Sequence, residues 1–85
     1  MISKDKNPVE WAAFLYELED AKEHLEALIN DVQATPEYDE IALKIDLGHV
    51  YSHLNRAWQR QKLARDFSDE EWTAASQFPN DVQPT

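Results

Sequence analysis

The sequence contains no cysteine, so disulfide bonds cannot stabilise the fold, which fits a reducing compartment. Glycine occurs once, and this scarcity disfavours both tight-turned β architectures and glycine-rich phosphate-binding loops. No stretch approaches the ~20 apolar residues that cross a bilayer, and the N-terminal residues lack the apolar core of a signal peptide. We therefore expect a soluble cytoplasmic protein that does not bind membranes.

Positive charge is also scarce, and most of it lies in one segment. The net charge of the 85-residue chain is −9. Residues 1–40 carry three lysines against eleven acidic residues, and residues 66–85 carry five acidic residues without any lysine or arginine. Because a phosphate backbone attracts net positive charge, this distribution argues against a nucleic-acid partner and favours a protein partner that is basic.

Apolar residues repeat at alternating steps of three and four along residues 8–33, which predicts a long helix with one buried stripe. Asn7 is the expected N-cap of this helix and Pro8 its first residue. The stripe consists of Trp11, Phe14, Leu18, Ala21, Leu25, Leu28 and Val32.

A second helix is predicted over residues 36–65, with Thr35 as N-cap and Pro36 at the first position. It carries two apolar stripes, of which a single antiparallel neighbour can cover one. The first stripe consists of Leu43, Leu47, Val50, Leu54, Ala57, Trp58 and Gln61, and the second of Tyr38, Ile41, Ile45, Gly48 and Ser52. Glycine in a helix interior costs about 1 kcal/mol against alanine. We therefore expect another element to approach closely at Gly48 and Ser52.

A short third helix is predicted over residues 69–77. Ser68 and Glu71 form a capping box, and Phe67 and Trp72 occupy the positions of a hydrophobic staple. Residues 79–85 are expected to form a frayed tail. The predicted fold is one all-α domain, a long antiparallel helical hairpin plus a short third helix. Because so small a chain buries only ~60% of its unfolded surface, and one stripe stays uncovered, we expect two copies to assemble as a homodimeric helical bundle.

The antiparallel hairpin also brings the basic end of the second helix beside the beginning of the first. Arg56 and Arg60 are therefore expected to approach Glu17, Glu19 or Asp20, as exposed ion pairs. The same segment contains Trp58, and arginine and tryptophan are enriched at interface hot spots. The predicted interaction residues are Arg56, Trp58, Arg60, Ile41, Ile45, Gly48 and Ser52, although a buried Trp58 with two salt-bridged arginines would equally be a structural feature.

Histidines four residues apart share a helix face and could bind a divalent metal, with a carboxylate completing the set. Asp46, His49 and His53 are candidate ligands of this kind, although half-buried histidines between apolar stripes often only pack and hydrogen-bond. Histidine phosphotransfer domains, whose histidine lies in a His-x-Leu-Lys-Gly-like context, are a second histidine-centred possibility. The nearest match, which begins at His53, lacks both the lysine and the glycine.

Two pairs of glutamates allow an enzyme interpretation. Glu23 with Glu26 and Glu37 with Glu40 resemble the paired carboxylates with which all-helical nucleotide pyrophosphohydrolases similar to MazG hold Mg²⁺. The resemblance implies a metal-dependent hydrolase, but Glu23 and Glu26 point away from the heptad stripe, as residues of a solvated surface do. The function that the sequence favours is a non-enzymatic protein–protein interaction module without a cofactor, such as a regulator, an adaptor or an immunity-like inhibitor.

Overall fold

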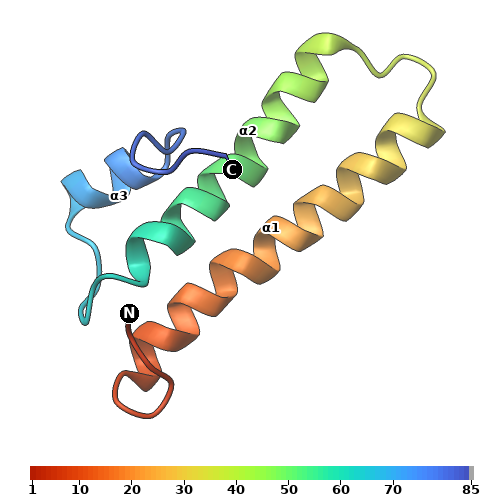
Figure 1. Cartoon of the computed structure of the whole chain (residues 1–85). Coiled ribbons are helices and arrows are strands. Elements are labelled where there is room, and N and C mark those ends of the chain that lie inside the picture. Colours follow the sequence, from red (N-terminus) through yellow and green to blue (C-terminus); the bar gives the residue numbers. More distant parts are fainter. Residues whose placement is uncertain (85) are drawn as a thin grey trace.

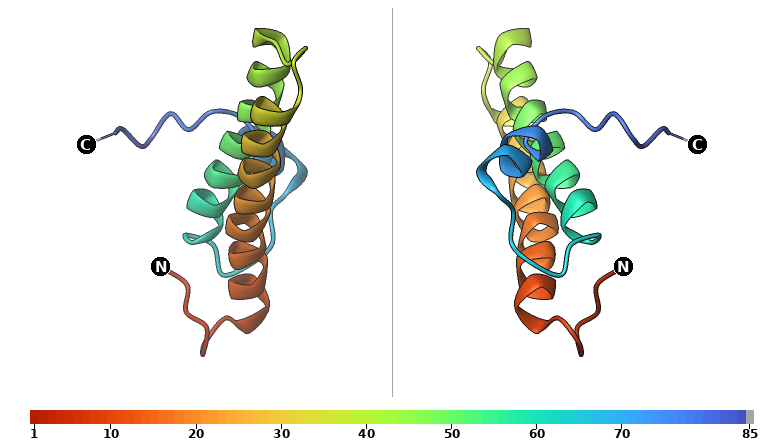
Figure 2. Two further views of the ribbon diagram at one scale, coloured as in Figure 1. Left: turned by 90° about the vertical axis from the view of Figure 1, so that its right-hand side faces the viewer. Right: turned by 90° about the vertical axis from the view of Figure 1, so that its left-hand side faces the viewer.

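The computed structural model describes residues 1–84 and contains three helices within them, namely α1 (Pro8–Ala34), α2 (Glu40–Arg60) and α3 (Asp69–Ala75). α1 and α2 pack antiparallel as a hairpin, and α3 lies against the C-terminal half of α2 (Figure 1). The body measures 47 × 29 × 24 Å, and both chain ends project to the same side of the helix pair (Figure 2). The predicted all-α hairpin with a short third helix is confirmed. None of the helices in the described part of the chain is long and apolar enough to cross a membrane.

α1 ends one residue beyond its predicted end, because the amide of Thr35 still donates to the carbonyl of Asp31. Asn7 occupies the predicted N-cap position, but its side chain does not cap the helix. Its Oδ1 accepts instead from the amide of Ser3 at 3.3 Å, and so fixes the turn that precedes α1.

The prediction that the second helix begins at Pro36 is wrong. Thr35 is occupied as the C-cap of α1, and the N-cap of α2 is Asp39, whose carboxylate accepts from the amide of Ala42 at 2.9 Å. α2 also ends at Arg60, five residues earlier than predicted. There the carbonyl of Gln61 accepts from the amide of Ile2 at 2.9 Å, so the N-terminal segment takes the place of a further helical turn.

α3 begins as predicted. The Ser68 hydroxyl accepts from the amide of Glu71, the Glu71 carboxylate accepts from the amide of Ser68, and the rings of Phe67 and Trp72 lie 6.2 Å apart. α3 ends at Ala75, two residues earlier than predicted, and beyond this end the Gln77 carbonyl accepts from the side chain of Asn55 in α2.

No other element of the described chain makes the close approach predicted at Gly48. A Cβ placed there would meet no described atom within 4 Å outside its own helix backbone. The hydroxyl of Ser52 donates to the Gly48 carbonyl, within α2 itself. α3 packs against the C-terminal half of α2, where Asn55 and Arg56 are buried. Because α3 is short, it does not cover the first two turns of α2.

The hairpin buries only part of the apolar stripe of α1. Ala21 and Leu28 are buried between the helices, whereas Leu18, Leu25 and Val32 are exposed. The residues of α1 that face α2 therefore lie to one side of the centre of the stripe. The polar Glu17 is among them. Because the contact with α2 is displaced in this way, polar residues are buried on one side of the hairpin and leucines stay exposed on the other.

Candidate functional site

A buried carboxylate joins the two long helices. Glu17 of α1 is only 7% exposed, and it accepts from Nε of Arg56 at 2.9 Å and from Nε of Arg60 at 3.1 Å. Nδ1 of His53 lies 2.9 Å from the same carboxylate. The sequence-based prediction that Arg56 and Arg60 approach Glu17 is confirmed. However, the expected exposed pairing is wrong, since the Arg56 side chain is 8% exposed.

The two arginines extend from Glu17 to α3. Arg56 Nη1 donates to the hydroxyl of Ser76 at 2.8 Å, and its guanidinium lies 4.4 Å from the ring centre of Trp72. The Arg60 guanidinium lies 4.3 Å from the ring centre of Phe67. Cations over aromatic faces are attracted by the ring quadrupole. The arginines therefore hold the capped start of α3 against the hairpin.

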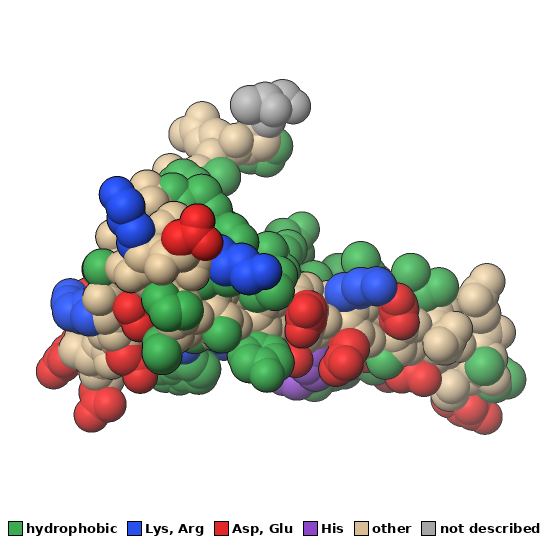
Figure 3. All heavy atoms as spheres, turned by 90° about the horizontal axis from the view of Figure 1, so that it is seen from below, with side chains coloured by type: hydrophobic (Ala, Val, Ile, Leu, Met, Phe, Trp, Pro, Cys, Tyr) green, Lys and Arg blue, Asp and Glu red, His purple; other side chains and the backbone are tan. Residues whose placement is uncertain are grey.

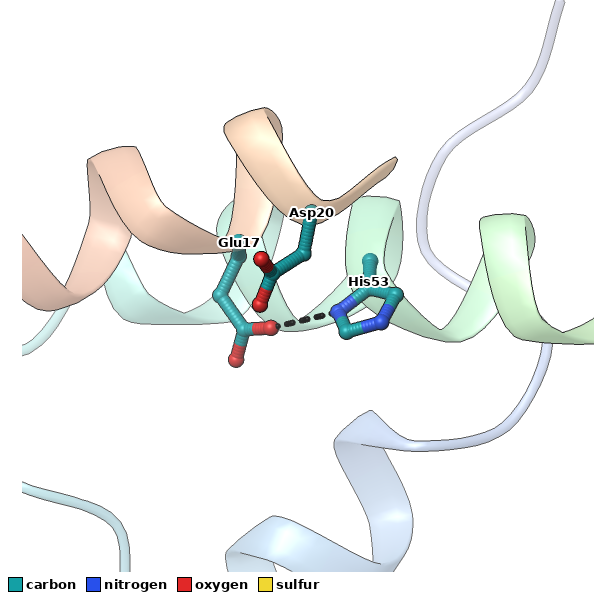
Figure 4. A group of neighbouring side chains, drawn as sticks. All are labelled: Glu17, Asp20 and His53. Atoms are coloured by element: carbon teal, nitrogen blue, oxygen red, sulfur yellow. Dashed lines mark hydrogen bonds and ion pairs between the residues drawn. The ribbon is translucent and has the colours of Figure 1, made fainter. Parts of the chain in front are cut away.

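The two contacts of His53 Nδ1 exclude one another. This atom lies 2.9 Å from Glu17 Oε1 and also 2.9 Å from Arg56 Nη2. A ring nitrogen carries either a proton, with which it can donate to Glu17, or a lone pair, with which it can accept from Arg56. Whichever tautomer is present, Nδ1 faces the buried cluster, and Nε2 lies on the other side of the ring (Figure 4).

All three histidines of the chain meet along this edge of the hairpin. The ring of His24 in α1 lies 5.0 Å from that of His53 and 5.7 Å from that of His49, both in α2. Asp20, one turn before His24, also belongs here. One donor atom each of Glu17, Asp20 and His53 lies within 4.8 Å of the other two. In Figure 4 the Glu17 carboxylate reaches the ring of His53, and the Asp20 carboxylate, also from α1, lies beside that of Glu17. We call Asp20, His24, His49 and His53 the histidine edge.

Asp46 is engaged elsewhere. Its carboxylate accepts from the hydroxyl of Tyr38 at 2.6 Å and so ties the connection between the long helices to α2. Burial of the Tyr38 hydroxyl and its hydrogen bond to Asp46 raise the pKa of Tyr38 to about 12. The structure therefore pairs His53 with Glu17 and Asp20 across the hairpin, whereas the sequence had suggested Asp46 and His49 from the same helix.

The four candidate glutamates lie on exposed surface, and among residues 1–84 none belongs to a group of three carboxylate or histidine donors close enough to share a metal ion. Glu26 pairs with Lys22 at 3.9 Å along α1, where both side chains are well exposed. Pairs of this kind contribute about 0–1 kcal/mol. The candidate glutamates are Glu23, Glu26, Glu37 and Glu40.

An apolar surface lies on the opposite side of the hairpin. Around α1, the buried Ala21 and Leu28 separate His24 from the leucines, and around α2 the buried Val50 and Ala57 separate His53 from Leu43 and Leu54. Because the histidines of the two helices touch, the apolar side chains of both helices must share the other side. We call this surface, whose members are 37 to 51% exposed, the leucine face: Leu15, Leu18, Leu25, Ile29, Leu43 and Leu54.

Figure 3 shows a row of hydrophobic side chains along the upper edge of the elongated body, and at its lower edge histidine beside acidic and further hydrophobic side chains. Trp58 borders the leucine face and is exposed rather than part of a core. Ile41 and Ile45, at 70 and 55% exposure, lie elsewhere, on the side of α2 that faces away from α1.

The C-terminal segment is attached to α2 through Asp81. Its carboxylate accepts from Lys62 Nζ at 2.8 Å and from the indole of Trp58 at 3.0 Å. These hydrogen bonds, that of Lys62 first, lower the pKa of Asp81 to about 2. The predicted frayed tail is therefore held at Asp81, and its last residue, Thr85, lies outside the described residues. A hollow of about 760 Å³ between α2, α3 and this segment is lined in part by Asn55 and Asp81.

His24 and Asp20 are the residues of the histidine edge that sequence reasoning had not connected with metal binding. A signal was present, because Asp20 and His24 are spaced by four residues, as are His49 and His53. Antiparallel helices can place two such pairs opposite each other, but the sequence alone does not determine which turns of one helix lie opposite which turns of the other.

No protein family, no curated protein and no solved structure matches this chain.

Proposed function

We propose that this chain is a non-enzymatic protein–protein interaction module that assembles as a homodimer through the leucine face. The observation that carries the proposal is the exposure of six large aliphatic side chains from two helices on one side of the hairpin. Monomeric proteins rarely expose an apolar patch of more than a few hundred Å², and larger ones mark interaction sites.

A second copy suits the size and shape of this surface. α1 and α2 lie side by side over about 30 Å, and at roughly 10 Å per helix they offer about 600 Å². Two copies would then bury about 1,200 Å² in total, which reaches the lower limit for a specific, stable interface. A twofold axis pairs a surface with itself, and apolar side chains satisfy this requirement without charge complementarity. Two hairpins that stack in this way form a four-helix bundle.

Such a dimer keeps its charge on the outside. The six members of the leucine face are uncharged, and the ion pair of Lys22 with Glu26 lies beside its α1 members, whereas the chain as a whole carries −9. Pairing would therefore double the negative charge around an apolar centre, and an acidic helical surface attracts a basic protein partner. This is the basis for a regulator, an adaptor or an immunity-like inhibitor as the role of the dimer.

The test compares two substitutions of the same kind on different faces. Light scattering after size exclusion should give twice the chain mass at micromolar concentration for the unmodified protein. Leu25→Glu places a charge in the leucine face and should yield a folded monomer. Ile45→Glu places the same charge on the uncovered side of α2 and should leave the dimer intact.

Circular dichroism establishes that both variants keep their helices. The proposal fails if the unmodified protein is a monomer. The assignment of the interface to the leucine face fails if Ile45→Glu separates the copies while Leu25→Glu does not, and the stripe with Ile41 and Ile45 would then be the contact surface.

A further inference from the structure

We propose that the histidine edge is a binding site for a transition-metal ion, with Zn²⁺ as the expected ion and Asp20, His24, His49 and His53 as its ligands. This site lies on the opposite side of the hairpin from the leucine face. It does not depend on the proposed dimer.

The ligand types fit this ion. Imidazole nitrogens suit zinc, copper and nickel, and three histidines with one carboxylate fill a tetrahedral coordination sphere. The chain has only three histidines, and all of them gather here from two different helices. α1 supplies Asp20 and His24 and α2 supplies His49 and His53, so each helix offers a pair spaced by one turn.

The distances between the histidine rings are also those expected for imidazoles bound to one metal ion. Two imidazoles on one tetrahedral zinc ion have ring centres roughly 5 Å apart, since each nitrogen lies about 2.0–2.1 Å from the metal. The ring of His24 lies 5.0 Å from that of His53 and 5.7 Å from that of His49. Among the described side chains, those of Glu17, Asp20 and His53 already bring three donor atoms within 4.8 Å of one another, whereas His24 and His49 must turn their rings to point a nitrogen at a shared ion. Both are exposed, and this exposure permits the rotation.

Glu17 serves this site from the second shell. Two guanidinium groups already occupy its carboxylate, so a cation bound directly to it would lie beside two positive charges. Its contact with His53 Nδ1 instead orients the ring of that histidine. A metal ion on Nε2 selects the tautomer with a proton on Nδ1, which then donates to Glu17. Metal-binding histidines commonly donate their other ring nitrogen to a carboxylate in this way.

The first experiment is a calorimetric titration of the untagged chain with Zn²⁺ at slightly alkaline pH, because only neutral imidazole binds a metal. We expect one ion per chain and a higher melting temperature with the ion than without it. Co²⁺ in place of Zn²⁺ should give the intense visible absorption of a tetrahedral site. An untagged chain that binds neither ion would overturn the proposal.

His24→Gln distinguishes this two-helix site from a site on α2 alone. It removes an exposed side chain, which rarely changes stability by more than about 0.5 kcal/mol, so the variant should stay folded. The loss of a ligand should weaken Zn²⁺ binding at least about tenfold, as much as the loss of a second-shell partner does. His49→Gln should behave in the same way.

Asp46→Asn is the matched control, because Asp46 lies on α2 beside His49 and His53 but is bonded to Tyr38. It should leave Zn²⁺ affinity unchanged. If Asp46→Asn weakens binding and His24→Gln does not, the ligands lie on α2 alone and the proposed site is wrong.

Discussion

The Glu17 carboxylate accepts from Nε of Arg56 at 2.9 Å, although both side chains are more than nine-tenths shielded from solvent. Removing charges from water is costly, and a buried pair is stable only where further hydrogen bonds satisfy both partners. Here Arg60 donates a further hydrogen bond to the Glu17 carboxylate, and Arg56 donates one to the hydroxyl of Ser76. The pair therefore fixes how α1, α2 and α3 sit together.

Glu17→Gln should destabilise the fold by about 3–5 kcal/mol, because it keeps the shape of the side chain but leaves the buried Arg56 without its anion, whereas Arg60 keeps its ion pair with Asp66. Urea denaturation followed by circular dichroism measures this change. Glu23→Gln, on exposed surface of the same helix, is the control and should change stability by less than about 0.5 kcal/mol. Equal effects of the two substitutions would show that the buried cluster contributes nothing.

The long first helix and the start of α3 could be predicted because their signals are local. The period of the apolar residues and the capping box at Ser68 depend on neighbours within one or two turns. The start of α2 could not be predicted in this way, because Thr35-Pro36 and Asp39 are both acceptable beginnings. The structure favours Asp39 since Thr35 still bonds to α1.

Only the part of the site that follows from antiparallel packing of the two long helices could be predicted. Antiparallel packing brings Arg56 and Arg60 to the level of Glu17, which the sequence indicated. It does not say how far each helix turns about its own axis. That rotation buries Glu17, brings His24 to His53 and leaves Leu25 exposed, and it depends on contacts between residues far apart in the chain.

Asp39→Ala should destabilise the protein by about 1 kcal/mol, because the amide of Ala42 loses its acceptor at the start of α2. Thr35→Ala should have little effect, since the side chain of Thr35 caps neither helix in the structure. Thermal or urea unfolding of the two variants compares them directly. If Thr35→Ala destabilised the protein more than Asp39→Ala, α2 would begin at Pro36 with Thr35 as its N-cap.

Acid should release the C-terminal segment from α2. The folded pKa of Asp81 is about 2 against an ordinary value of 3.8, so its contribution to stability is present above pH 4 and is lost as the pH falls towards 2. The indole N–H of Trp58 donates to Asp81, and its proton resonance should therefore shift with an apparent pKa of about 2.

Asp81→Asn is the control for this titration, because an amide in place of the carboxylate has no proton to gain. In that variant the Trp58 indole resonance should stay constant over the same range of pH. A wild-type resonance that titrates near 3.8 would show that Lys62 and Trp58 do not hold the carboxylate in solution.

Gly48→Ala should stabilise the protein by about 0.4–1 kcal/mol. Alanine has the higher helix propensity and restricts the unfolded chain, and a methyl group at this position meets no described atom within 4 Å outside the helix backbone. Gly48 lies away from the leucine face, so the gain should persist in the dimer, and urea denaturation at two protein concentrations checks this. A loss of stability that grows with protein concentration would instead place a second copy against Gly48, on the side of α2 that carries Ile41 and Ile45.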